Sequence, residues 1–239
     1  MIFDPPLVPA RLLQRYKRFL FDAVLEDGTP ITGFCPNTGS MRGLTAPGSR
    51  IWISLHSSPT RKYRHMLEMV EADGTLVGIN AAFANRLAEE ALGTGLVPAL
   101  SGYGSLHREQ RYGNRSRIDF LLREPGRPDC YVEVKNVHFV RECGLAEFPD
   151  TVTIRGARHL DELGDVVAAG HRAVMLYVVQ RQDCERFRLC TDLDPRYAAA
   201  FRRAAERGVE AYVLRCRVTP AEIVAIDLIG MDEAGLPAL

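Results

Sequence analysis

Residues 130–137 read CYVEVKNV and predict a buried β-strand with charged side chains in its middle. Tyrosine and valine favour strands, and this run contains three valines and one tyrosine. Because side chains alternate between the two faces of a strand, Glu133 and Lys135 share one face, whereas Val132 and Val134 share the other. A carboxylate next to an ammonium in such a strand indicates either an ion pair on an exposed face or a chemical site.

A second acid lies on the run just upstream. SRIDFLL, residues 116–122, also has the composition of a strand, and its Asp119 stands between two apolar residues, where an acid is costly without a partner. The intervening REPGRPD, residues 123–129, is short and rich in turn formers. We therefore expect a hairpin that brings Asp119 close to Glu133.

Two neighbouring carboxylates make an oxygen-rich site suited to Mg²⁺ or Mn²⁺. Lys135 could orient a water molecule or stabilise charge on a phosphate, and Glu90, on a helix before the strands, could supply a further metal ligand. This layout of Asp119, Glu133 and Lys135 is that of the PD-(D/E)xK phosphodiesterases. The pattern alone also occurs by chance. His159, which follows Arg158, could face the same pocket or solvent.

The chain changes character near residue 80. The first part reads as five short strands with hairpin turns at Asp27-Gly28 and Asp73-Gly74, which predicts a small OB-like barrel or Greek-key domain over residues 1–80. Residues 81–239 alternate strands and helices, which predicts an α/β domain with a mixed sheet. We expect helices near 80–95, 155–169 and 195–208, and strands near 103–110, 117–122, 130–135, 172–180 and 209–218.

The charge of the chain is uneven although its net value is zero. Residues 1–66 contain nine Lys or Arg and four Asp or Glu, and the remainder contains 21 and 26. Basic residues next to aromatic ones on a barrel suit single-stranded nucleic acid, and solvated surface charge is the alternative reading. The candidate contacts are Arg11, Arg15, Lys17 and Arg18. NTGSMRG, residues 37–43, could be a backbone nest for an anion with Arg42 beside it, or simply a structural loop.

The six cysteines are scattered without a C-x-x-C pair, which indicates free thiols and no zinc site. The start of the chain lacks the features of a secretory signal, and no apolar run is long enough to cross a bilayer. We expect a cytoplasmic protein without a membrane partner.

Seven motifs resemble, in the same order, the sugar fermentation stimulation protein (SfsA) family, over about residues 7–227. They are LLQRYKRFL, CPNTGSM, NRLAEEAL, SRIDFLL, CYVEVKNV, FPDTVTIRGARHL and GVEAYVL. The resemblance implies an N-terminal OB fold, a C-terminal PD-(D/E)xK nuclease-like domain, and binding of DNA without marked sequence preference. It places the nuclease-like site on Glu90, Asp119, Glu133 and Lys135, with His159 matching. Arg158 stands where the family more often has lysine, although the positive charge is kept.

The sequence thus predicts a nucleic-acid-binding protein with a metal-dependent phosphodiesterase site that uses Mg²⁺ or Mn²⁺. One alternative is a non-catalytic DNA-binding regulator of sugar (maltose) metabolism, in which the nuclease fold is only a scaffold. Another is an enzyme acting on a small phosphate compound held by residues 37–43. The sequence does not distinguish DNA from RNA or single from double strands, and it leaves the oligomeric state open.

Overall fold

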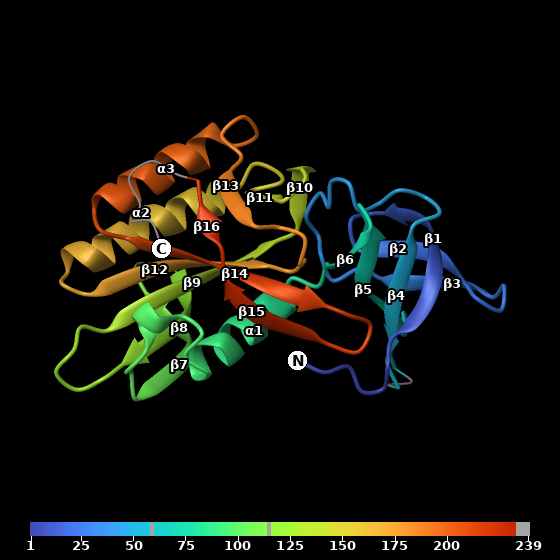
Figure 1. The fold of residues 1–239 in the computed structure, drawn as a ribbon, viewed down its shortest axis with the longest axis horizontal. Coiled ribbons are helices and arrows are strands. Elements are labelled where there is room, and N and C mark those ends of the chain that lie inside the picture. The colour runs from blue at the N-terminus through green and yellow to red at the C-terminus, as the bar shows by residue number, and fades with distance from the viewer. Residues whose placement is uncertain (58–59, 114–115, 233–239) are drawn as a thin grey trace.

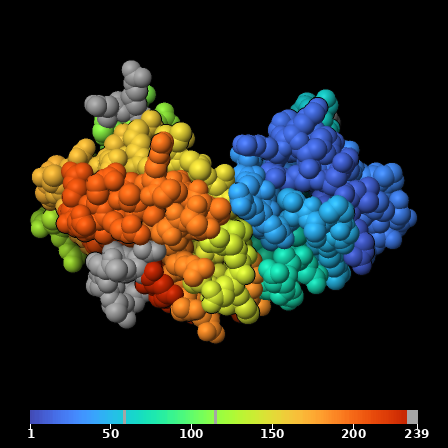
Figure 2. All heavy atoms as spheres, turned by 90° about the horizontal axis from the view of Figure 1, so that it is seen from above, coloured from blue at the N-terminus to red at the C-terminus, as the bar shows by residue number. Residues whose placement is uncertain are grey.

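The computed structural model describes residues 1–57, 60–113 and 116–232 and contains two domains joined side by side (Figure 1). Within these residues no helix is long and apolar enough to span a bilayer. Seen from above, the two lobes meet at a narrow waist with a notch beside it (Figure 2).

The first domain is a closed five-stranded barrel with one added strand. Its order is β3-β2-β1-β4-β5-β6, and pairing between β3 and β5 closes the barrel. The strands are β1 (Val8–Tyr16), β2 (Leu20–Leu25), β3 (Pro30–Phe34), β4 (Arg50–Leu55), β5 (His65–Ala72) and β6 (Thr75–Gly78). The predicted OB-like barrel is therefore confirmed.

Both predicted hairpin turns join neighbouring strands of the barrel. Asp27-Gly28 connects β2 to β3, and Gly28 has φ +85°, a conformation that glycine adopts without strain. Asp73-Gly74 is the two-residue connection between β5 and β6, and both of its residues have positive φ. The sequence indicated five strands here, and the described residues contain six, among them β1, in which a shift in register between Leu12 and Gln14 interrupts the alternation.

The second domain is built on a six-stranded mixed sheet of order β15-β14-β12-β9-β8-β7. Its strands are β7 (Ser105–Tyr112), β8 (Ser116–Arg123), β9 (Cys130–Val137), β12 (Arg172–Val179), β14 (Glu210–Val218) and β15 (Ile223–Leu228). Strands β9, β12 and β14 are parallel, and the outer strands are antiparallel to their neighbours. This confirms the predicted α/β domain with a mixed sheet.

Helices cover both faces of this sheet (Figure 1). α1 (Ala82–Gly93) packs with Val132 and Val134 on one face, whereas α2 (Ile154–Ala168) and α3 (Pro195–Glu206) pack on the other. η1 (Pro98–Leu100) follows α1. The Thr153 hydroxyl accepts a hydrogen bond from Gly156 N at the start of α2, and Asp194 caps α3.

A small second sheet has the order β10-β11-β13-β16, and its edge strand β10 lies toward the barrel (Figure 1). It comprises β10 (Phe139–Glu142), β11 (Leu145–Phe148), β13 (Arg186–Leu189) and β16 (Gly230–Met231). The first residues of the chain pack on the second domain, not on the barrel. The Met1 ammonium bonds to Ile223 O, and Phe3 N bonds to Ala221 O. The beginning of the chain therefore ties the domains together.

Candidate active site

Asp119 and Glu133 meet where β8 and β9 separate. The β8–β9 ladder runs from Phe120–Val132 to Leu122–Cys130, so Asp119 lies just beyond its end. There the Asp119 Oδ2 accepts a hydrogen bond of 2.7 Å from Val134 N. The side chain of Asp119 thus takes a place that a backbone carbonyl would otherwise fill, and this holds it beside the central strand.

Glu133 is almost fully buried and faces α2. Its Oε1 lies 2.6 Å from Lys135 Nζ and 2.5 Å from His159 Nδ1. Its Oε2 is buried without a hydrogen-bond partner in the described part of the chain. Burial opposes ionisation of Glu133, but the hydrogen bond from His159 and the charge of Lys135 outweigh it and lower the pKa. Glu133 is therefore a carboxylate with one free oxygen at neutral pH.

Asp119 titrates in the opposite direction. Burial and the negative charge of Glu133 raise the pKa of Asp119, although hydrogen bonds from Val134 N and from the Asn85 amide act against this. Asn85 Nδ2 donates to Asp119 Oδ1 over 2.8 Å. Two neighbouring carboxylates whose pKa values move apart are a feature of many active sites, and this makes Asp119 and Glu133 a candidate site.

Helix α1 presents Asn85 to this pair, and the prediction of Glu90 as a site residue needs correction. Glu90 binds the Met1 ammonium at 2.9 Å and Arg86 at 3.3 Å, and its side chain is 43 % exposed. Each residue turns a helix by about 100°, so Glu90 lies about 140° around α1 from Asn85. Glu90 therefore anchors the start of the chain instead.

Arg158 and His159, which are neighbours on α2, have different surroundings. Arg158 is exposed and lies 3.8 Å from Glu162. His159 is buried, and its Nε2 accepts a hydrogen bond of 3.2 Å from Arg155 Nε. Because Nε2 is an acceptor, the ring carries its proton on Nδ1 and donates it to Glu133. His159 thus fixes the orientation of the Glu133 carboxylate.

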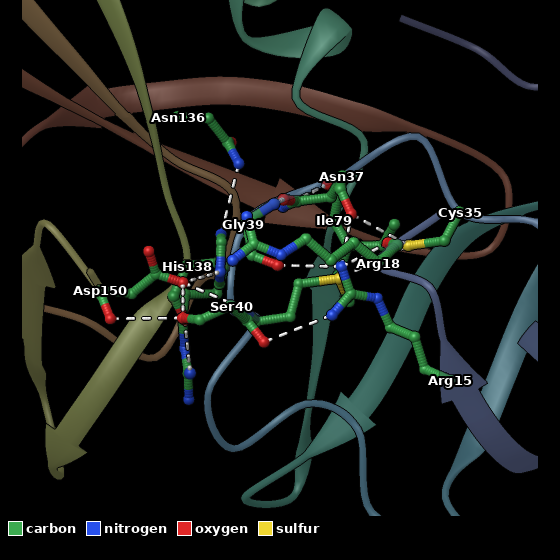
Figure 3. A network of polar contacts seen from close by, with 12 residues as sticks. Arg15, Arg18, Cys35, Asn37, Gly39, Ser40, Ile79, Asn136, His138 and Asp150 are labelled. Carbon is green, nitrogen blue, oxygen red and sulfur yellow. Dashed lines mark hydrogen bonds and ion pairs between the residues drawn. The ribbon is translucent and has the colours of Figure 1, made fainter. Parts of the chain in front are cut away.

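The loop over residues 35–41 of the barrel joins the second domain through Asp150 (Figure 3). Asp150 Oδ2 accepts hydrogen bonds from Ser40 Oγ at 2.6 Å and Met41 N at 3.0 Å. Burial opposes ionisation, but nearby His138, Ser40 and the Met41 amide lower the pKa of Asp150 to about 2. The loop does surround an anion, and that anion is a carboxylate of the same chain. The alternative hypothesis, that residues 37–43 hold a small phosphate compound, is weakened, because Ser40 Oγ and Met41 N already donate to Asp150.

Further polar contacts lead from this junction toward β9, the strand that carries Glu133 and Lys135. Asn136 follows Lys135 in β9 and contacts His138 Nδ1 at 3.3 Å (Figure 3). Gln180 Nε2 donates both to Asn136 Oδ1, at 2.6 Å, and to the backbone oxygen of Asn80. The end of β9 is therefore held against the residues that link the two domains.

Arg15 serves this junction, so its prediction as a nucleic-acid contact is corrected. Its guanidinium donates to the backbone oxygens of Arg18, Asn37 and Gly39 at 2.5–2.9 Å and thereby shapes the loop. The other predicted contacts are exposed: Arg11, Lys17, Arg18 and Arg42. Arg11 also donates to Gly48 O at 3.1 Å.

The sequence analysis missed several polar residues at the site and at the junction. Asn85 lies inside NRLAEEAL, one helical turn before Glu89, so helical spacing could have suggested it. Asp150 and Ser40 are 110 positions apart, and nothing local in the sequence pairs them.

The fold and the site define a class: a closed OB barrel joined to a nuclease-like α/β domain that carries an Asp, a Glu and a Lys on adjacent strands. The chain belongs to the sugar fermentation stimulation protein family. Residues 13–79 match the SfsA N-terminal OB domain, and residues 82–222 match the sugar fermentation stimulation protein RE domain.

Similar proteins agree with this membership. The sugar fermentation stimulation protein homolog of Agrobacterium fabrum is 70 % identical over 233 residues, which is 98 % of each chain. The homolog of Sinorhizobium medicae is 67 % identical over 239 residues and 100 % of both chains. The structure of SfsA from Pyrococcus furiosus, solved in complex with Ca²⁺, superposes with a TM-score of 0.87 at 27 % identity and covers 98 % of both chains.

Proposed function

We propose that this protein binds nucleic acid and hydrolyses phosphodiester bonds with a divalent metal ion held by Asp119 and Glu133. The observation that carries the proposal is the buried Glu133 carboxylate, which pairs through Oε1 and leaves Oε2 without a partner in the described residues. A buried, unpartnered carboxylate oxygen is costly, and a cation satisfies it. Asp119 provides the second carboxylate.

The donor set fits Mg²⁺ or Mn²⁺, because both ions prefer carboxylate and water oxygens. The Ca²⁺ in the structure of the Pyrococcus furiosus protein supports the proposal, since Ca²⁺ is also a hard cation bound by oxygen. The bound ion would neutralise phosphate charge and acidify a water molecule.

The protein side chains supply the remaining chemistry. Lys135 Nζ, held 2.6 Å from Glu133 Oε1, donates to the scissile phosphate and stabilises the negative charge that develops there. His159 donates to the same Glu133 oxygen and so leaves Oε2 as the oxygen available to the metal ion. Asn85 and Val134 N hold the Asp119 carboxylate in place. These residues keep the two carboxylates pre-organised before the substrate binds.

The barrel holds the nucleic acid through exposed basic side chains, among them Lys17, Arg18 and Arg42. Contacts to phosphate carry no sequence information, so binding shows little sequence preference and weakens steeply with salt.

The test is cleavage of end-labelled single- and double-stranded DNA and RNA with Mg²⁺, Mn²⁺ or EDTA, with Asp119→Ala assayed beside the wild type. We expect cleavage that requires the metal and is lost in the variant. Salt-sensitive binding without cleavage in any metal would contradict the enzyme and leave a DNA-binding regulator built on a nuclease fold.

A further inference from the structure

A cavity of about 470 Å³ lies between the end of β7 and the second half of α2. The described residues that line it include none of the candidate active site. Three of its lining side chains have rings: Tyr112, Tyr131 and His171. The ring centroids of Tyr112 and Tyr131 are 5.9 Å apart, and those of Tyr131 and His171 are 5.7 Å apart. A ligand in the cavity therefore meets a continuous group of rings.

Three residues that line the cavity each have a buried polar atom without a hydrogen-bond partner in the described ranges. These atoms are the Tyr112 hydroxyl, Glu162 Oε2 and His171 Nδ1. Tyr112 is only 8 % exposed, and Glu162 lies against the end of β7, since a Cβ at Gly113 would be 3.7 Å from Glu162 Cδ. Arg158 lies 3.8 Å from the other Glu162 oxygen, which is too far for a hydrogen bond. Buried polar atoms are almost always paired, so three of them at one cavity indicate a place that receives a ligand.

The lining side chains define the chemistry of that ligand. A phosphate group inside the cavity would be repelled by the carboxylates of Glu162 and Asp165. A metal ion is not matched either, because no three His, Cys, Asp or Glu side chains of the described residues could hold one together. The unpartnered groups include an acceptor, on Glu162, and a hydroxyl that both donates and accepts, on Tyr112. A planar ring with donors and acceptors on its edge suits both these groups and the aromatic walls.

A nucleobase with an exocyclic amino group is such a ring. Its faces stack on aromatic side chains, and its amino group donates to a carboxylate, as that of cytosine does to Glu or Asp. Uracil presents a carbonyl oxygen at the same position, which would face the negative charge of Glu162. Arg111 is exposed at the edge of the cavity, where its charge disfavours an organic cation and suits the phosphate of a nucleotide.

The cavity follows the candidate active site along both β9 and α2. Tyr131 precedes Glu133 by two residues in β9, so their side chains share one face about 7 Å apart. Glu162 follows His159 by three residues in α2, so these two side chains share one face of the helix. His159 Nδ1 lies 2.5 Å from Glu133 Oε1, so the strand and the helix run together from this contact to the cavity. A nucleotide near the scissile phosphate is therefore within reach of the cavity.

We propose that the cavity binds an amino-bearing nucleobase of the nucleic acid, with the ring against Tyr131 and the amino group on Glu162 Oε2. The Tyr112 hydroxyl donates to a ring acceptor of the same base, and Arg111 contacts the adjoining phosphate. The inference rests on the proposed function and deepens it, because it names a nucleotide position at which the protein reads a base. The phosphate contacts of the barrel carry no such information.

The experiment compares the binding of two labelled single strands of equal length, oligodeoxycytidylate and oligodeoxyuridylate, to the full-length protein. Fluorescence anisotropy in EDTA at neutral pH measures both Kd values without cleavage. The strands have the same backbone charge and differ only at the base edge that Glu162 reads. We expect the wild type to bind the cytosine strand about tenfold more tightly than the uracil strand. In Glu162→Gln this ratio falls close to one, because the amide of glutamine both donates and accepts.

Asp161→Asn is the matched control for charge. Asp161 neighbours Glu162 on α2 and carries the same charge, but its side chain is 55 % exposed and pairs with Arg203. We expect Asp161→Asn to keep the wild-type ratio. Tyr112→Phe removes only a hydroxyl group, so we expect it to weaken binding of the cytosine strand several-fold and to keep the preference for cytosine.

The outcomes distinguish this inference from the proposed function. Equal binding of both strands by the wild type, or a preference that survives in Glu162→Gln, would overturn the inference and leave the proposed function standing. A preference lost equally in Asp161→Asn would also overturn it, because bulk charge would then explain the effect. If Glu162→Gln folds poorly, Tyr112→Phe decides, and an unchanged affinity for the cytosine strand overturns the inference. Binding to neither strand would overturn it too, and no binding to double-stranded DNA or RNA as well would overturn the proposed function.

Discussion

Asp150 and Glu133 are both buried carboxylates of the second domain, yet their surroundings differ. Asp150 receives hydrogen bonds from Ser40 and from the Met41 amide of the barrel, so the fold itself satisfies it. Glu133 pairs through one oxygen only, and its other oxygen is buried without a partner in the described residues, beside a second carboxylate, Asp119. The comparison teaches that hydrogen bonding separates a carboxylate that the fold satisfies from one that keeps an oxygen free to bind a ligand.

The difference predicts opposite effects of the same chemical change in the two regions. Replacing a carboxylate by an amide at the catalytic pair removes activity and preserves stability. The same replacement at the junction removes stability and preserves the chemistry of the folded protein.

Asp119→Asn gives the largest expected effect. We expect the cleavage rate to fall about a hundredfold or more, since one of the two carboxylates that hold the metal is lost. We expect the urea midpoint to stay the same or rise. Because burial and Glu133 raise the folded-state pKa, Asp119 takes stability from the fold as the pH rises from the ordinary value of 3.8 through the raised pKa, and the loss is complete above that pKa. Single-turnover cleavage and urea unfolding at pH 7 measure the two effects.

The comparison fails at the catalytic pair if Asp119→Asn unfolds more easily and still cleaves. Lys135→Met is the matched variant, because it removes the ammonium that pairs with Glu133 and keeps both carboxylates. We expect it to lower the cleavage rate as well.

Asp150→Asn gives the next largest effect, on stability. Loss of a buried charged acceptor costs about 1–3 kcal/mol, which urea unfolding at pH 7 detects. The folded-state pKa of about 2 lies below the ordinary value of 3.8, so the ionised carboxylate stabilises the fold above pH 3.8. This contribution, on the order of 2 kcal/mol, is lost as the pH falls from 3.8 toward 2. The difference between wild type and variant therefore shrinks over that window.

Ser40→Ala is the matched change from the barrel side, because it removes one of the two donors to Asp150 Oδ2. A stability difference that stays constant down to pH 2 would show that Asp150 does not act through its charge. A loss of cleavage by folded Asp150→Asn would show that the junction takes part in the chemistry.

The sequence predicts those parts of the molecule in which local pattern decides the structure. The valine-rich run of β9 and the two Asp-Gly turns identify a central strand and two hairpins, because propensity and turn chemistry act over a few residues. The four strands of the small sheet contain two to four residues each, too few for a periodic pattern to emerge.

The candidate site was harder to predict from the sequence than the fold. Strand pairing follows from the hairpin, so the proximity of Asp119 and Glu133 could be predicted. The choice between Asn85 and Glu90 on α1 needed the exact rotation of the helix, because the five positions between them turn the side chain by about 140°. Arg15 reads as an exposed cation in the sequence, and only the folded loop shows that backbone oxygens occupy its guanidinium.

Arg15 and its basic neighbours also supply the prediction with the smallest effect. Lys17 and Arg42 are exposed. We therefore expect Lys17→Gln and Arg42→Gln each to make the fall of log K for DNA binding with log salt concentration shallower, by about 0.7–0.9 for one lost phosphate contact. Fluorescence anisotropy of labelled single-stranded DNA over a range of KCl concentrations measures this slope. Arg196→Gln, an exposed position on α3, is the control and leaves the slope unchanged.

Arg15→Gln lowers the urea midpoint instead, because three backbone oxygens lose their donor. Equal slopes in all four variants would place the nucleic acid elsewhere on the molecule and end the division of these cations into binding and structural groups.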